Sequence, residues 1–219
     1  TEIYTLSLHD ALPICSAGDW LTGDNGNDLL IGGAGDDDMY GGADNDYLIG
    51  GSGNDQMRGN AGDDTLTGGA GNDIYRIGGG VSFNREVFGN DTILADEANG
   101  NDTLFVKNTS KPQYATRNGD DLVLHFAIDG VSGEQTITLQ GWYLSEENKV
   151  RGFRYQDQFA HVDIRGRLDA GTNGADYLDY SGNGANLFVY GLGGNDTIVS
   201  GMGNDQIIGG AGNDEYVFA

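Results

Sequence analysis

The chain has 219 residues, including 39 Gly but only 2 Pro, and its formal net charge is −23. This charge disfavours nucleic acids and anionic membrane surfaces as partners and favours cations. The single Cys excludes an internal disulfide framework, and no apolar run is long enough to span a membrane. The charge is uneven, with a net −10 in residues 16–76, −4 in residues 77–167 and −7 in residues 168–219, which predicts three segments.

Residues 1–14, TEIYTLSLHDALPI, match none of the patterns that follow them. They resemble the conceptual translation of a sequencing-library adapter, so we expect a non-native segment, native sequence from near Ser16, and a fragment of a longer protein. The alternatives are an apolar strand or a shortened export signal. The segment lacks the basic start and the continuous apolar centre of a signal peptide.

A repeat of nine residues begins at Gly23 and reads GDNGNDLLI, GGAGDDDMY, GGADNDYLI, GGSGNDQMR, GNAGDDTLT and GGAGNDIYR. A weaker row, ICSAGDWLT, precedes it in phase. The sixth column is always Asp, at positions Asp19, Asp28, Asp37, Asp46, Asp55, Asp64 and Asp73. The eighth column is always apolar, at positions Leu21, Leu30, Met39, Leu48, Met57, Leu66 and Tyr75.

The pattern continues less regularly after Tyr75. Asp91 in FGNDTI lies eighteen residues after Asp73, and Asp102 in NGNDTL repeats the phrase. After a restart at GTNGADYLD and a break in spacing, three rows follow: GLGGNDTIV, SGMGNDQII and GGAGNDEYV. These rows predict a second repeat block.

Each row divides into a six-residue loop and a three-residue strand, in which alternation turns only the eighth column inward. Such short strands cannot be buried alone, so the rows must stack. Gly lets the loop turn left-handed and aim carbonyl oxygens inward. Together with the Asp carboxylates these are hard oxygen donors, of which Ca²⁺ takes about six to eight. Turn formation alone would explain many Asx residues but not an Asp at every ninth position.

The rows resemble the RTX nonapeptide GGxGxDxUx, in which U is apolar, strongly over residues 15–76 and in part over residues 171–217. The resemblance implies an all-β, right-handed parallel β-roll in two blocks, residues 15–104 and a truncated block at residues 168–219. A β-rich module, expected to be antiparallel, separates them at residues 105–167. It also implies that each row stacks on the next but one, with roughly four to seven Ca²⁺ ions between stacked loops.

The resemblance assigns to each ion the column-six carboxylates of both stacked rows. It adds the backbone carbonyls of columns two and four in the lower row, and the backbone carbonyls of columns one and three in the upper row. The implied metal residues are Asp24, Gly26, Asp28, Gly33, Gly35, Asp37, Gly41, Ala43, Asp46, Gly50, Ser52, Asp55, Gly59, Ala61, Asp64, Gly68, Ala70, Asp73, Asp91, Leu192, Gly194, Asp196, Asp205, Gly209, Ala211 and Asp214. Asp44 replaces a column-four Gly, and Cys15 and Ala17 weaken a site at Asp19 and Asp37. Asp205 has no clean partner eighteen residues away.

Residues 105–167 contain two apolar runs of strand length, DDLVLHFAI and QTITLQGWY, a hairpin turn at residues 118–121, and a short helix predicted from Ser145. We expect the aromatic residues to form a small core rather than a ligand groove, and His125 and His161 to serve packing or the surface. The aromatic residues in question are Trp142, Tyr143, Phe153, Tyr155 and Phe159.

The sequence has no HExxH, GxSxG or P-loop motif, so we expect no enzyme activity in this fragment. The resemblance implies the calcium-binding region of a larger, secreted bacterial protein that folds on calcium outside the cell and supports type I secretion and an attached effector. The alternatives are an adhesion or glycan-binding surface, or the C-terminal part of a secreted hydrolase or epimerase. Calcium ions and covalently attached catalytic or adhesive domains are the expected partners, without nucleic acid or a membrane span.

Overall fold

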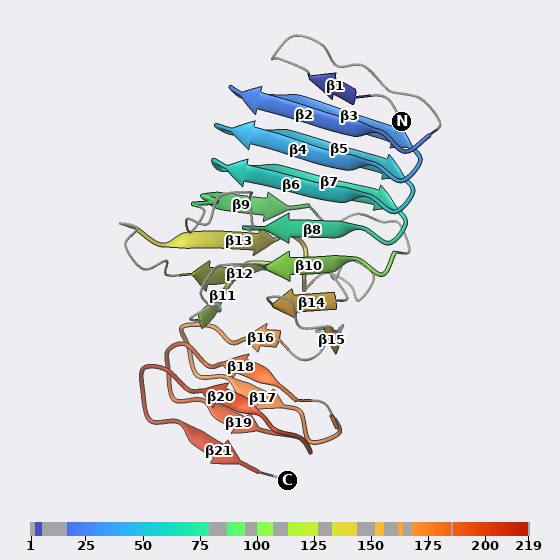
Figure 1. The fold of residues 1–219 in the computed structure, drawn as a ribbon. Helices are drawn as coiled ribbons and strands as arrows, with labels where there is room; N and C mark the ends of the chain where they lie inside the picture. The colour runs from blue at the N-terminus through green and yellow to red at the C-terminus, as the bar shows by residue number, and fades with distance from the viewer. Residues whose placement is uncertain are drawn as a thin grey trace.

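The computed structural model describes residues 3–5, 17–78, 87–94, 100–106, 114–126, 133–143, 152–155, 162–163, 168–184 and 186–218. All the regular elements in these ranges are β-strands, and the chain winds into stacked coils whose successive strands alternate between two sheets (Figure 1). This confirms the predicted all-β fold of stacked parallel strands. Within the same ranges no helix is long and apolar enough to cross a membrane.

One long sheet has the strand order β1-β2-β4-β6-β8-β10-β14-β15. Its strands are Ile3–Thr5 (β1), Trp20–Asn25 (β2), Asp38–Ala43 (β4), Gln56–Ala61 (β6), Ile74–Ile77 (β8), Thr103–Val106 (β10), Gly152–Tyr155 (β14) and Val162–Asp163 (β15). The other long sheet has the order β11-β12-β13-β9-β7-β5-β3. Its strands are Leu29–Ala34 (β3), Tyr47–Ser52 (β5), Thr65–Ala70 (β7), Asn90–Ile93 (β9), Tyr114–Asn118 (β11), Asp121–Phe126 (β12) and Gln135–Leu139 (β13).

The core of the first block is the eighth column of the repeat. Leu21 lies opposite Met39, and Met39 opposite Met57, so each row stacks on the next but one as predicted. The other sheet has the same register, with Leu30 opposite Leu48. The whole column is at most 1% exposed: Leu21, Leu30, Met39, Leu48, Met57, Leu66 and Tyr75. Burying each side chain contributes about 1.5–3 kcal/mol, which stacking alone makes possible.

The middle module extends the solenoid instead of forming a sheet of its own. β11, β12 and β13 are antiparallel as expected, but β13 pairs in parallel with β9, and β14 in parallel with β10. Trp142 is 1% exposed in the core and Tyr143 packs against it, which confirms the core assignment for these two residues. Several predictions fall outside the described residues. They concern the helix that begins at Ser145, the residues Phe159 and His161, and the side chains of Phe153 and Tyr155.

The second block contains two three-stranded parallel sheets, β16-β18-β20 and β17-β19-β21. Their strands are Leu168–Ala170 (β16), Tyr177–Asp179 (β17), Phe188–Tyr190 (β18), Thr197–Val199 (β19), Gln206–Ile208 (β20) and Glu215–Val217 (β21). Ile198 is fully buried, whereas Tyr216 on the last strand is 42% exposed. The Ala170 N–H donates to the Tyr143 hydroxyl (3.2 Å), which joins this block to the module.

Removing residues 1–14 should leave calcium-induced folding unchanged. In the structure β1 adds three residues to the edge of the sheet, where Ile3 lies opposite Trp20, but β2 keeps its full pairing with β4 without it. Thermal melts of the shortened and complete chains in calcium test this expectation. A drop of several degrees on truncation would show that the segment contributes to the fold.

Candidate metal centre

The column-six carboxylates form a buried ladder in the stacked loops. Each of them from Asp19 to Asp73 is at most 4% exposed, a rare environment for a charged group. In every stack the backbone N–H of the lower Asp donates to Oδ1 of the Asp one coil above. Asp28 donates to Asp46, and Asp37 to Asp55, both at 2.8 Å. The predicted stacked pairs are therefore brought together.

The second carboxylate oxygen, Oδ2, is the unsatisfied atom of the ladder. It is shielded from solvent and has no hydrogen-bond partner in Asp19, Asp37, Asp46, Asp55, Asp64 and Asp196. Leaving a buried charged acceptor unpaired costs more than the about 1–3 kcal/mol of a neutral group. A cation beside Oδ2 would remove this cost.

Column-one glycines keep the space beside Oδ2 open. A Cβ at Gly23 would lie 2.6 Å from Asp28 Oδ2 and 2.5 Å from the Gly41 carbonyl oxygen of the coil above. A Cβ at Gly50 would meet Asp55 Oδ2 and lie 2.6 Å from the Gly68 carbonyl oxygen. The carboxylate and the column-one carbonyl thus converge on one gap, which only Gly leaves free.

Columns two and four have the left-handed backbone that the repeat predicts. In the first block, and in the rows that begin at Gly191 and Gly209, their glycines have positive φ, and so do the residues that replace Gly there: Asp24 (70°), Asp44 (75°), Asn60 (76°) and Leu192 (77°). Asx residues tolerate this region, but a bulky Leu rarely does. A Cβ at Gly42 would collide with the Asp24 carbonyl oxygen of the coil below, so that carbonyl faces the next coil, as the family resemblance implies.

The column-three carbonyls already accept hydrogen bonds. The Gly26, Gly35, Gly53 and Gly194 N–H groups donate to the carbonyls of Ala43 (3.1 Å), Ser52 (2.8 Å), Ala70 (2.8 Å) and Ala211 (2.8 Å), respectively. A carbonyl oxygen has two lone pairs, so each retains one acceptor position. These carbonyls are weaker candidate ligands than those of column one.

Burial raises the pKa of the central carboxyls. The pKa of Asp46 and of Asp55 is about 7 and that of Asp64 is about 6. Desolvation is the largest cause in all three, and a backbone N–H hydrogen bond from the coil below opposes it. Stacked carboxylates add to the rise at Asp46 and Asp55. A bound cation would favour the charged form and displace protons.

Three stacked pairs fall outside the spacing of eighteen. The Asp64 N–H donates to Asp91 (3.1 Å), 27 residues on, and the Asp73 N–H to Asp102 (2.9 Å), 29 residues on. Asp91 thus stacks on Asp64. It does not stack on Asp73, although Asp73 is the residue eighteen positions before it. In the second block the Asp176 N–H donates to Asp196 (3.0 Å), 20 residues on. The predicted site set omitted Asp19, Asp102 and Asp176, although each lies in a recognisable Asp-containing phrase.

The regular pair of the second block forms as predicted. The Asp196 N–H donates to Asp214 Oδ1 (3.1 Å), eighteen residues on. Asp205 Oδ1 accepts the N–H of Leu187 (2.9 Å), also at a separation of eighteen. Leu187 has no carboxylate, so the position below Asp205 lacks the second charge that the other stacks have.

Column five forms a ladder of its own that the sequence interpretation missed. The Asn45 N–H donates to the side chain of Asn27 (3.0 Å), and the Asp63 N–H to that of Asn45 (2.9 Å). The Asn54 N–H donates to Asp36 in the same way (2.6 Å). The sequence feature that could have predicted this ladder is the constant Asn or Asp in column five. These side chains accept hydrogen bonds from loop N–H groups on the exposed edge.

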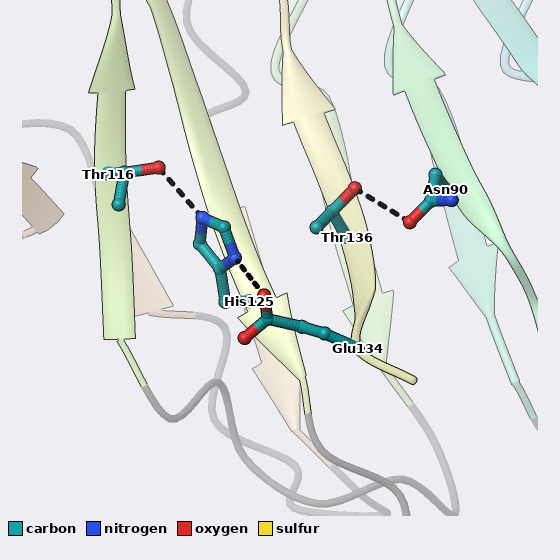
Figure 2. A network of polar contacts seen from close by, with 5 residues as sticks. All are labelled: Asn90, Thr116, His125, Glu134 and Thr136. Carbon is teal, nitrogen blue, oxygen red and sulfur yellow. Dashed lines mark hydrogen bonds and ion pairs between the residues drawn. The ribbon is translucent and has the colours of Figure 1, made fainter. Parts of the chain in front are cut away.

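A second polar network lies on the outward face of the middle module (Figure 2). The Thr116 hydroxyl lies 2.7 Å from His125 Nε2, and His125 Nδ1 lies 3.0 Å from Glu134. The distances resemble a hydroxyl–imidazole–carboxylate relay. Thr116 and His125 lie on β11 and β12, whose residues are paired in the β-ladder, and among the described residues no oxyanion donors are seen beside them. We assign the network to cross-strand pairing.

A family model described as the RTX calcium-binding nonapeptide repeat (4 copies) matches residues 16–48, 49–81 and 180–216. These segments are RTX calcium-binding nonapeptide repeats. RTX repeats bind calcium, RTX β-rolls are structural domains, and RTX proteins are typically secreted. No curated protein matches the chain. The buried Oδ2 atoms, the converging carbonyls and the lack of Cys and His in the described RTX loops fit calcium.

Gly50→Ala should weaken the calcium response more than Gly182→Ala. The Cβ at position 50 would occupy the gap between Asp55 Oδ2 and the Gly68 carbonyl, whereas a Cβ at position 182 meets nothing within 4 Å. Overpacking costs about 1–3 kcal/mol. Calcium titrations followed by circular dichroism should show a higher midpoint for Gly50→Ala alone. Equal midpoints would contradict the position of the gap.

Proposed function

We propose that Ca²⁺ binds between stacked rows and that its binding folds this region outside the cell. The observation that carries the proposal is the ladder of buried Oδ2 atoms without hydrogen-bond partners, which in Asp37, Asp46, Asp55 and Asp196 share a gap with a carbonyl oxygen of the next coil. Ligand roles are assigned to the stacked pairs Asp28–Asp46, Asp37–Asp55, Asp46–Asp64, Asp55–Asp73 and Asp196–Asp214, with the carbonyls named above.

The irregular stacks extend the proposed sites. The same N–H to Oδ1 contact joins Asp19 to Asp37 (2.8 Å) and the three pairs of longer spacing described above. Asp205 is the weakest of the proposed ligands, because Leu187, the residue below it, supplies no carboxylate. Occupancy should therefore be highest in the regular coils of the first block.

Calcium acts in this proposal as the counter-ion without which the coils repel one another. Residues 16–76 have a net charge of −10, and the apolar core takes one side chain from each row. A ligand that binds only the folded state stabilises it by about 2.7 kcal/mol per site at a hundredfold excess over its Kd. Because neighbouring sites share an Asp, filling one site orders half of the next, and folding becomes cooperative.

Secretion follows from the same chemistry. Extracellular calcium modules have Kd values of about 10⁻⁴–10⁻³ M, far above cytosolic calcium, so the acidic chain would stay unfolded inside the cell. An unfolded chain suits export, and folding on reaching external calcium would prevent its return. In this proposal the region supports type I secretion and stabilises an attached effector, which could be catalytic or adhesive.

Calcium titration of the complete chain tests the proposal. In excess chelator at pH 7.5 the far-UV circular dichroism spectrum should be that of a disordered chain, and millimolar calcium should restore β structure cooperatively. Magnesium should substitute poorly, because it demands stricter octahedral geometry. Identical spectra and protease resistance with and without calcium would overturn the proposal.

A further inference from the structure

One continuous hydrophobic core joins the two repeat blocks through the middle module, and we call it the shared core. It runs from Leu21 in the first block, through Trp142 in the module, to Tyr190 in the second block. At the junction β11 of the module lies beside β16 and β18 of the second block (Figure 1). Among the described residues the second block also has a small separate core, which consists of three buried side chains: Leu187, Val189 and Ile198.

Leu192 in the second block has a strained backbone. Its φ is 77°, in the left-handed region, where the other non-Gly residues of the described loops are Asp or Asn. A short Asx side chain tolerates this region through local hydrogen bonds, whereas Leu has no polar group and needs support from its surroundings. Leu192 is partly buried and packs against the shared core, not against the small core of its own block. The support for its strained conformation therefore comes from the core that the module helps to build.

The Leu192 carbonyl is one of the oxygens proposed to bind calcium in this block. A Cβ at Gly210 would collide with the Leu192 carbonyl oxygen, so this oxygen points toward the next coil. In the same loops a Cβ at Gly191 would collide with Asp196 Oδ2 and lie 2.5 Å from the Gly209 carbonyl oxygen. Asp196 is 1% exposed, and its Oδ2 has no hydrogen-bond partner among the described residues. One residue thus contacts the shared core with its side chain and presents its carbonyl to the candidate site.

Hydrogen bonds connect the module to the backbone beside Leu192. The Tyr143 hydroxyl of the module accepts the N–H of Ala170 (3.2 Å), the last residue of β16. Two residues further on, the Thr172 carbonyl accepts the N–H of Gly193 (3.3 Å), which directly follows Leu192. The module therefore supports Leu192 both through the shared core and through this short stretch of backbone.

We propose that Leu192 is a positioning residue that makes the calcium site at Asp196 and Asp214 depend on the docked middle module. The shared core holds the Leu192 side chain, the side chain keeps the backbone left-handed, and the backbone aims the carbonyl at the ion. The inference rests on the proposed calcium function and adds a condition that applies to the second block. The first-block loops do not need this support, because their left-handed positions hold Gly, Asp or Asn.

Hydrogen exchange of the complete chain, followed peptide by peptide with mass spectrometry during a calcium titration, tests the inference. Leu192→Gly removes the side chain and relieves the strain, because Gly adopts positive φ freely. If strain were the only feature of Leu192, the calcium midpoint for protection of the second block would fall. We expect it instead to rise about fivefold relative to that of the first block, because the carbonyl is no longer held in place.

Three further variants separate positioning from general destabilisation. Asn60→Gly is the matched control in column two of the first block, where φ is 76°, and it should leave the first-block midpoint within about twofold of the wild type. Leu192→Met keeps an apolar side chain and should stay within about twofold as well. Tyr143→Phe keeps the ring and loses the hydroxyl, so it should raise the second-block midpoint alone, by about threefold. Combined with Leu192→Gly it should add less than its separate effect, because both changes break the same link.

The first block serves as an internal reference in every variant. A second-block midpoint that falls or stays constant in Leu192→Gly would overturn the inference. An equal rise in the first block, or fully additive effects of Tyr143→Phe and Leu192→Gly, would also overturn it. Calcium-dependent protection that none of these variants changes would refute the positioning role and leave the calcium function intact. Exchange that is independent of calcium in every peptide would overturn both.

Discussion

Calcium-stripped protein should be unfolded at pH 7.5 and should recover β structure in its first block on acidification to pH 5. The carboxyls of Asp46 and Asp55 have a pKa of about 7 in the folded chain, and that of Asp64 about 6, mainly because of burial. In the unfolded chain an Asp titrates near 3.9. The folded state therefore binds more protons than the unfolded state between about pH 4 and pH 7.

The sign of the pH dependence follows from this difference. Stability falls with rising pH wherever the folded state binds more protons, so the contribution of these carboxyls is fully present below about pH 4 and is lost as pH rises through 6–7. Protonation removes the buried charge that calcium would otherwise neutralise. The calcium-loaded protein should behave in the opposite way, because acid then displaces the ion.

Circular dichroism of the stripped protein at pH 5, 6 and 7.5, and urea titrations of the calcium-loaded protein at the same pH values, measure both trends. The matched variant is Asp55→Asn, which keeps an Oδ1 acceptor for the Asp37 N–H but cannot ionise. In the stripped state at pH 7.5 it should be more stable than the wild type, with a smaller pH dependence. A stripped wild-type chain whose stability rises from pH 5 to pH 7.5 would contradict the role of these carboxyls.

The stacking of the first block could be predicted because its information is local. An Asp every ninth residue and an apolar residue two positions later fix both the turn length and the inward face, so the opposition of Leu21 and Met39 follows from the period. The positive φ at Asp44 was also expected, since Asx tolerates that region. The sequence shows an Asn or Asp at every column-five position of the first block. Interpreting these residues only as turn formers did not predict the hydrogen-bond ladder that they form.

The irregular coils could not be predicted because their partners depend on long-range pairing. The spacing of eighteen suggests that Asp91 lies above Asp73, yet its strand β9 pairs with β7, which places it on Asp64. The steps from Asp64 to Asp91 and from Asp73 to Asp102 are 27 and 29 residues long, and spacing alone cannot say which sheet receives the next strand. For the same reason the antiparallel pairing of β12 and β13 was expected, but the addition of β13 to β9 was not.

Asp55→Asn should raise the calcium concentration needed for folding far more than Asp205→Asn. Both residues accept, through Oδ1, an N–H from eighteen residues before, at 2.8 Å for Asp55 and 2.9 Å for Asp205. Asn preserves that acceptor in both, and both variants lose one negative charge. The two sites differ in what they stack on.

Asp55 stacks between Asp37 and Asp73, so its carboxylate is shared by two proposed calcium sites. Asp205 lies above Leu187, which supplies no carboxylate to the stack. Losing one ligand in each of two coupled sites should shift the calcium midpoint by about tenfold or more, which corresponds to about 1.4 kcal/mol, whereas Asp205→Asn should shift it less than twofold. Calcium titrations by circular dichroism, with isothermal titration calorimetry to count the ions, measure the difference. Equal shifts would mean that general charge, and not the stacked register, controls calcium binding.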